Sequence, residues 1–186
     1  MNYHNLTYPD QNNGDGLRVV LWLSGCSHHC KGCQNPQTWD KNSGILFDDE
    51  AKKELFNELK KDYISGITFS GGDPLNISNL DNVLDLINNI SNEYPNKTIW
   101  IYSGYTWEEC QPFKEDGFLK PMEFAPKLQK LLKKRFAIVS KCDVFVDGEY
   151  IEELKDVTLP WRGSSNQRVI DVQKSLKEGK VILHCK

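Results

Sequence analysis

The sequence lacks a long apolar run, a strong excess of either charge and a recognisable secretion signal. No segment approaches the roughly 18 apolar residues that a membrane-spanning helix needs. The net charge of the 186 residues is only −3, which gives no field that attracts nucleic acid or an anionic membrane. The opening MNYHNLTYPDQNNGDG has no cationic stretch followed by an apolar core. We therefore expect a cytoplasmic protein that binds neither nucleic acid nor membrane.

Internal repeats and linkers are also missing, and the length suits a single domain over residues 1–186. Apolar runs rich in β-branched and aromatic residues predict strands at 18–24, 66–70 and 98–103, and a further strand region that begins at 136–137 and continues at 142–146. Short strands are predicted at 169–172 and 181–184. Amphipathic patterns predict helices at 48–61, 79–90 and 127–135. This alternation predicts an α/β fold with a mainly parallel sheet.

Four of the predicted strands are followed directly by segments rich in cysteine, glycine or polar residues. These segments are the cysteine-rich stretch 26–33, Gly71-Gly72-Asp73-Pro74, Ser103-Gly104-Tyr105 and Asp147-Gly148. Ligands of parallel sheets gather at the carboxyl ends of the strands. We therefore expect one cavity to collect all four segments.

Cysteines are sparse outside one short segment, so no disulfide framework is expected. Cys26, Cys30 and Cys33 have the spacing C-x3-C-x2-C, whereas the other three cysteines are scattered. A structural zinc ion needs four ligands, usually from paired CxxC elements, and no second pair is present. His28 or His29 can be considered as a fourth ligand, but both are expected at the loop surface.

A dithiol pair formed by Cys30 and Cys33 would leave Cys26 unexplained. An iron–sulfur cube instead accepts one thiolate per iron, so three cysteines hold three corners. The fourth iron stays open for a substrate or cofactor, as does the vacant position of a catalytic zinc.

The cysteine spacing after the first predicted strand resembles the signature of the radical S-adenosylmethionine (SAM) superfamily. Gly71-Gly72-Asp73-Pro74 is similar to the glycine-rich GGEP motif of the same superfamily, with Asp73 where glutamate is common. The resemblance implies an incomplete (βα) barrel, one [4Fe-4S] cluster held by Cys26, Cys30 and Cys33, and SAM bound at the open iron.

The same resemblance implies candidate SAM contacts. Many members carry an aromatic residue before the third cysteine; Gly32 stands there, so backbone contacts are expected from Gly32, Cys33 and Gln34. Gly72 is expected to bind the methionine amino group through its backbone. Asp73 is expected to support that loop, and Ser103 to contact the carboxylate or ribose of SAM; these candidates are Gly32, Cys33, Gln34, Gly72, Asp73 and Ser103.

The chain is similar, nearly throughout, to the family of glycyl-radical activases that serve anaerobic ribonucleoside-triphosphate reductases. The matching segments include MNYH at the start, GDGLR at 14–18, GCQNP at 32–36 and WRGSSNQR at 161–168. The match is thinnest over 111–134, a stretch that resembles an insertion. The resemblance implies reductive cleavage of SAM and hydrogen abstraction from a glycine in the large subunit of the reductase, with Arg162 and Asn166 contacting that partner. A small electron donor such as flavodoxin would reduce the cluster.

Two other functions remain open at this point. An activase of the pyruvate formate-lyase type would perform the same chemistry on another glycyl-radical protein. A non-catalytic adaptor would hold zinc through the three cysteines and one histidine. Metal content and the choice of partner separate these alternatives.

Overall fold

The computed structural model describes residues 1–112 and 125–185, so much of the stretch 111–134 lies outside the described residues. Within them no helix is long and apolar enough to span a bilayer. The strands are β1 (Asn2–Asp10), β2 (Leu17–Leu23), β3 (Ile45–Leu46), β4 (Ile64–Gly71), β5 (Thr98–Tyr102), β6 (Val144–Asp147) and β7 (Arg168–Asp171). The α-helices are α1 (Asp49–Leu59), α2 (Leu80–Glu93), α3 (Ala125–Val139) and α4 (Val172–Glu178).

The strands form one mixed sheet in the order β3-β1-β2-β4-β5-β6-β7. The four central strands, β2, β4, β5 and β6, run parallel to one another. β1 pairs antiparallel with β2 and with β3, and β7 pairs antiparallel with β6. The expected α/β fold with a mostly parallel sheet is therefore confirmed.

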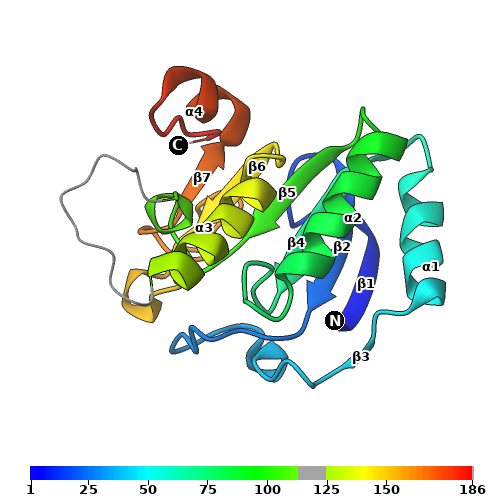
Figure 1. The fold of residues 1–186 in the computed structure, drawn as a ribbon, viewed down its shortest axis with the longest axis horizontal. Coiled ribbons are helices and arrows are strands. Elements are labelled where there is room, and N and C mark those ends of the chain that lie inside the picture. The colour runs from blue at the N-terminus through cyan, green and yellow to red at the C-terminus, as the bar shows by residue number, and fades with distance from the viewer. Residues whose placement is uncertain (113–124, 186) are drawn as a thin grey trace.

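The helices α1, α2 and α3 lie across one face of this sheet (Figure 1). Alternate strand residues point toward them because side chains of a strand alternate between its two faces. Leu21, Phe69 and Ile101 belong to the core on the helical side, together with Leu55 of α1 and Leu86 of α2. Burial of this apolar surface is the main stabilising contribution to the fold.

The opposite face of the sheet carries larger and more polar side chains. Trp100 of β5 forms a second small cluster there with Val144, Val146 and Val169. Arg18 is fully buried close to it and lies 5.3 Å from the centre of the Trp100 ring. The carbonyl and hydroxyl oxygens that accept hydrogen bonds from its guanidinium belong to Asp15, Ile67, Thr68 and Thr98. These bonds join β2, β4 and β5.

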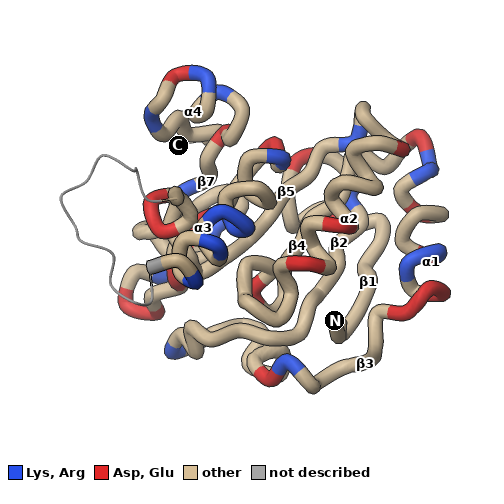
Figure 2. The backbone as a smooth tube through the Cα atoms, viewed as in Figure 1, with Lys and Arg blue, Asp and Glu red and all other residues tan. Residues whose placement is uncertain are grey.

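Local signals explain where α1 begins. The Asp48 side chain accepts a hydrogen bond from the Ala51 amide, and Asp49 and Glu50 occupy the first turn of α1. Both features favour a helix amino terminus. Basic residues are frequent on α3, whereas α1 carries both signs of charge (Figure 2).

Three predictions about secondary structure were wrong. Phe136 and Ala137 were assigned to a strand but belong to α3, because its apolar periodicity extends beyond Arg135. No strand was predicted at the start of the chain, yet Asn2–Asp10 is β1. This strand pairs with β3 only at Asn2 and Tyr3 and is partly exposed, which tolerates polar residues. The segment 181–184 contributes only an isolated bridge from Leu183 to Ile170.

Candidate active site

The loops that follow the four parallel strands meet at one pocket of about 370 Å³. The pocket is lined from these loops by Cys26, Cys30, Cys33, Gly71, Gly72, Asp73, Ser103, Gly104 and Gly148. The convergence expected from the sequence is therefore confirmed. The segment 159–167 supplies a further wall.

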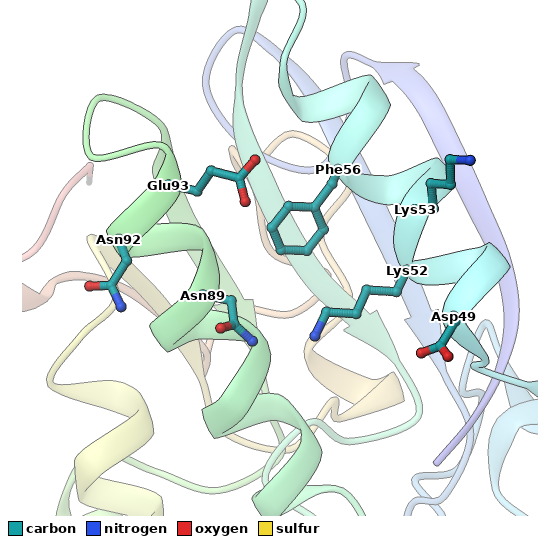
Figure 3. Close-up of a pocket in the computed structure, with 7 residues that line it drawn as sticks. All are labelled: Asp49, Lys52, Lys53, Phe56, Asn89, Asn92 and Glu93. Carbon is teal, nitrogen blue, oxygen red and sulfur yellow. The ribbon is translucent and has the colours of Figure 1, made fainter.

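A larger hollow of about 580 Å³ lies elsewhere, between α1 and α2 on the helical face (Figure 3). Figure 3 shows Lys52 extending from α1 below the Phe56 ring toward α2. Its Nζ lies 3.7 Å from Asp85 of α2. None of the residues lining this hollow belongs to the cysteine-rich or glycine-rich segments at the strand ends. The hollow is therefore not a candidate site for binding a metal cluster or SAM.

The cysteine loop, residues 26–33, leaves the end of β2 and is fixed at its base by the backbone. The Gly25 amide donates to the Thr38 carbonyl at 2.7 Å, and the Cys26 amide donates to the Trp39 carbonyl at 3.0 Å. The exposed His29 ring stacks on Trp39 with 4.7 Å between ring centres. The expectation that His29 lies at the surface is thus confirmed.

The thiols of Cys26 and Cys30 lie in surroundings that favour their protonated form before metal binds. Burial raises the pKa of Cys26 to about 11, although backbone N–H groups of His28 and His29 act in the opposite direction. Burial also raises the pKa of Cys30. Binding of a metal centre must therefore displace protons from these sulfurs, since the thiolate is the ligand.

The three thiols fit a cluster better than a single ion. All six cysteines are described and all are free. In residues 1–112 and 125–185, no three His, Cys, Asp or Glu side chains converge closely enough to hold one metal ion. A cubane distributes its thiolates over separate irons. Three cysteines around one pocket therefore suit a [4Fe-4S] cluster, whereas the compact tetrahedron of structural zinc is not formed in these residues.

The loop after β4 is held directly against the end of β2. The Gly72 amide donates to the Leu23 carbonyl and the Asp73 amide to the Gly25 carbonyl, both at 2.7 Å. Gly71 has φ +97°, and a Cβ on it would lie 2.7 Å from the Leu23 nitrogen. The Asp73 carbonyl accepts from the Asn76 amide and from the Asn79 side-chain amide, both at 3.0 Å. The carbonyl oxygens of Gly71 and Gly72 are therefore the acceptors of this loop to consider for an ammonium group.

The Asp73 carboxylate links this loop to the end of β5. It is 1% exposed and accepts hydrogen bonds from the Leu75 amide, the Ser103 hydroxyl and the Gly104 amide at 2.7–3.1 Å. Asp73 therefore supports the loop, as expected. Ser103 donates to the same carboxylate, which orients its hydroxyl within the pocket wall.

His28 is the clearest departure from the sequence analysis. It was expected at the loop surface, but its side chain is only 9% exposed and lies between two carboxylates. Its Nδ1 is 2.7 Å from Glu149 and its Nε2 is 2.9 Å from Asp73. Burial alone would lower the pKa of His28, but the two carboxylates outweigh it and raise the pKa to about 9.

Most of the expected SAM contacts lie in the pocket lining, and one does not. Cys33, Gln34, Gly72, Asp73 and Ser103 all line it. Gly32 lies outside the lining, where a Cβ would lie 2.0 Å from a carboxylate oxygen of Glu152. All six remain predictions as SAM contacts.

The two residues expected to contact a partner have different surroundings. Arg162 lines the pocket; its Nε is buried without a hydrogen-bond partner, and its Nη1 donates to the Gln167 carbonyl at 3.4 Å. Asn166 lies outside the lining, and its side-chain amide donates to the Glu149 carbonyl at 2.8 Å. Gln167 donates to the Gly148 carbonyl at 2.9 Å, so this segment also braces the loop after β6.

Sequence reasoning missed several aromatic and apolar residues of the pocket. They are Trp22, Tyr102, Tyr150, Leu159 and Trp161. A signal was present for two of them, because Trp22 and Tyr102 alternate with core residues of their strands and so face away from the helices. The others lie on irregular segments that carry no such periodicity.

Comparison with known proteins places this geometry in a family. Residues 12–170 match the family model of the 4Fe-4S single cluster domain. A protein of Haemophilus influenzae is 38% identical over 90% of this chain and 96% of its own. A protein of Escherichia coli K12 is 39% identical over 91% of this chain and 97% of its own, and one of Enterobacteria phage T4 is 36% identical over 91% and 93%.

All three relatives carry the same name, anaerobic ribonucleoside-triphosphate reductase-activating protein. The matches extend over about nine-tenths of the chain, and the family model covers residues 12–170, a range that includes every residue lining the pocket. The chain therefore belongs to the family of anaerobic ribonucleoside-triphosphate reductase-activating proteins, and it contains a 4Fe-4S single cluster domain.

Proposed function

We propose that this chain is a radical SAM enzyme that generates a glycyl radical on the large subunit of an anaerobic ribonucleoside-triphosphate reductase. The observation that carries the proposal is the meeting of the cysteine loop and the Gly71–Asp73 loop in one pocket. The names of the relatives supply the partner. The incomplete-barrel form of the fold and a cytoplasmic location belong to the same proposal.

Different residues of the chain bind the cluster and SAM. Cys26, Cys30 and Cys33 hold the [4Fe-4S] cluster and leave one iron without a protein ligand. The Gly71 and Gly72 carbonyl oxygens would accept from the SAM amino group, since the amides of Gly72 and Asp73 are bonded to β2 and Gly25 and the Asp73 carbonyl is bonded to Asn76 and Asn79. When bound, the cluster and SAM together supply the one-electron cleavage that allows removal of a hydrogen atom from a glycine.

The surrounding residues restrict access to the reacting groups. Tyr102, Tyr150 and Trp161 cover part of the pocket with aromatic surface, which limits the entry of water. Arg162 presents a donor in the same wall. The glycine-bearing segment of the reductase would enter beside these side chains, and a small carrier such as flavodoxin would deliver the electron.

The direct test is anaerobic incubation of the iron-loaded protein with SAM, a reductant and the reductase large subunit. We expect a glycyl radical, detected by electron paramagnetic resonance (EPR), together with methionine and 5′-deoxyadenosine. The matched control is the Cys33→Ala variant, which should lose both the cluster and the radical. A wild-type protein that binds four irons but yields no radical on this subunit would contradict the proposal.

Two further arms address the alternatives. Replacing the reductase by pyruvate formate-lyase tests partner choice, and we expect no radical on that protein. Metal analysis after anaerobic purification tests the adaptor hypothesis, and we expect iron and sulfide in a brown protein. Stoichiometric zinc in a colourless protein would refute the enzyme function.

A further inference from the structure

His28 occupies the middle of the three-residue spacer between Cys26 and Cys30, yet its side chain points inward. Its Nδ1 lies 2.7 Å from Glu149, which follows β6. Its Nε2 lies 2.9 Å from Asp73, although the ring N–H does not point directly at the carboxylate. The ring also packs edge-on against Tyr105 at 4.5 Å. The spacer is therefore attached to three loops that follow three different strands.

Asp73 is a fixed anchor for this contact. Its carboxylate is already held by Leu75, Ser103 and Gly104, and its amide donates to Gly25. Asp73 follows Gly72 directly, so its position also fixes the carbonyls of the Gly71–Asp73 loop. A side chain that reaches from the cysteine loop to Asp73 consequently fixes the distance between that loop and these carbonyls.

The surroundings of His28 leave room for the imidazole only because Gly104 has no side chain. A Cβ on Gly104 would lie 2.5 Å from Cδ2 of His28 and 2.7 Å from its Nε2. The conformation of Gly104 itself is not restricted to glycine, since its φ is not positive. Glycine is therefore required at position 104 because any side chain there would clash with the His28 ring.

We propose that His28 is a positioning residue that fixes the cysteine loop relative to the Gly71–Asp73 loop. In this arrangement a single SAM molecule reaches the open iron and the loop carbonyls simultaneously. The contact with Asp73 performs this role, whereas the more exposed Glu149 orients the ring from the other side. The inference rests on the proposed function, because it concerns SAM at the same site.

Two amide substitutions separate the two contacts of the ring. In His28→Asn the amide nitrogen takes the approximate place of Nδ1, so the Glu149 contact is retained and the Asp73 contact is lost. In His28→Gln the longer side chain takes the place of Nε2, so the Asp73 contact is retained. Gly104→Ala displaces the ring without removing it. Lys31→Gln is the matched control, because Lys31 lies in the same loop but forms only an exposed ion pair with Glu153.

Iron content, SAM affinity and the EPR spectrum of the reduced cluster are measured for each variant. We expect full iron content throughout, since the three cysteines are unchanged. SAM affinity should fall about tenfold or more in His28→Asn and Gly104→Ala, as expected for loss of a buried contact to a charged group. The change that SAM causes in the EPR spectrum should shrink in the same two variants. His28→Gln and Lys31→Gln should resemble the wild type.

A measurement on the metal-free protein tests whether His28 holds the cysteine loop in place, independently of SAM binding and catalysis. Hydrogen exchange of the amides in 26–33 should be faster in metal-free His28→Asn than in metal-free His28→Gln. Wild-type SAM affinity and EPR response in both His28→Asn and Gly104→Ala would overturn the proposal, as would loss of iron in His28→Asn, which assigns the residue to cluster assembly. If the wild-type protein itself binds no SAM, the proposed function fails instead.

Discussion

Arg162 is a donor in the pocket wall that has spare hydrogen-bonding capacity. Its Nε is buried without a partner, which costs free energy unless a bound group accepts from it. We predict that Arg162→Ala lowers the yield of glycyl radical about tenfold or more, because hydrogen bonds from charged groups contribute that much. Iron content should stay unchanged, since no cysteine is affected.

EPR spin counting at fixed reductase concentration measures this effect. Lys155→Ala serves as the control, because Lys155 is an exposed cation of the neighbouring segment. A parallel SAM-binding measurement tells whether Arg162 acts on SAM or on the reductase. A variant with full radical yield would show that the unpaired Nε has no role in the reaction.

At the residue scale, the spacing of residues along the chain was enough to predict sites formed within a single loop. The cysteines belong to one loop, so their separation alone indicated a shared ligand. The burial of His28 depends on Asp73 and Glu149, which lie far along the sequence and meet it only in the folded chain. No local pattern contains that information.

At the element scale, the central strands and helices were predictable because their burial is periodic. β2 and β5 consist of nearly continuous apolar residues. In β4 the buried residues Ile64, Ile67 and Phe69 supply the apolar signal between serines, glycines and a threonine. β1 was missed because polar residues and Pro9 interrupt its pattern, and pairing with β2 overrides that weak propensity. The pocket lies at the carboxyl ends of the parallel strands. Because those strands were predicted from the sequence, the glycine-containing loops that follow them could also be assigned to the pocket.

The junction between β4 and β2 depends on the absence of a side chain at Gly71. We predict that Gly71→Ala lowers the free energy of unfolding by about 3 kcal/mol, from backbone strain and a clash with β2. Gly179→Ala is the matched control, because Gly179 also has a positive φ but nothing lies within 4 Å of its Cβ position. Strain alone should cost about 1 kcal/mol there.

Urea unfolding of the metal-free proteins gives both values under the same conditions. The difference between the two variants isolates the contact with Leu23 from the conformational strain. Equal destabilisation by the two substitutions would show that β4 can move away from β2 without cost. The close packing of the Gly71–Asp73 loop would then not be a requirement of the fold.

At the scale of the whole molecule, stability and chemistry lie on different parts of the sheet. The main apolar core lies between the sheet and α1, α2 and α3. Cys26, Cys30 and Cys33 are only partly buried and lie in the loop after β2. We therefore expect the core to form without the cluster, unlike small domains that fold only around a metal.

Removal of iron by an anaerobic chelator tests this separation. We predict that the metal-free protein keeps its far-ultraviolet circular dichroism and a cooperative thermal transition, because the core of β2, β4 and β5 against α1 and α2 stays buried. Hydrogen exchange should accelerate only in the cysteine loop and in the segment 148–155, which contacts it through Glu149 and Glu153. Loss of the cooperative transition on chelation would instead show that the cluster is part of the folding unit, as in a zinc finger, and that the core alone is insufficient.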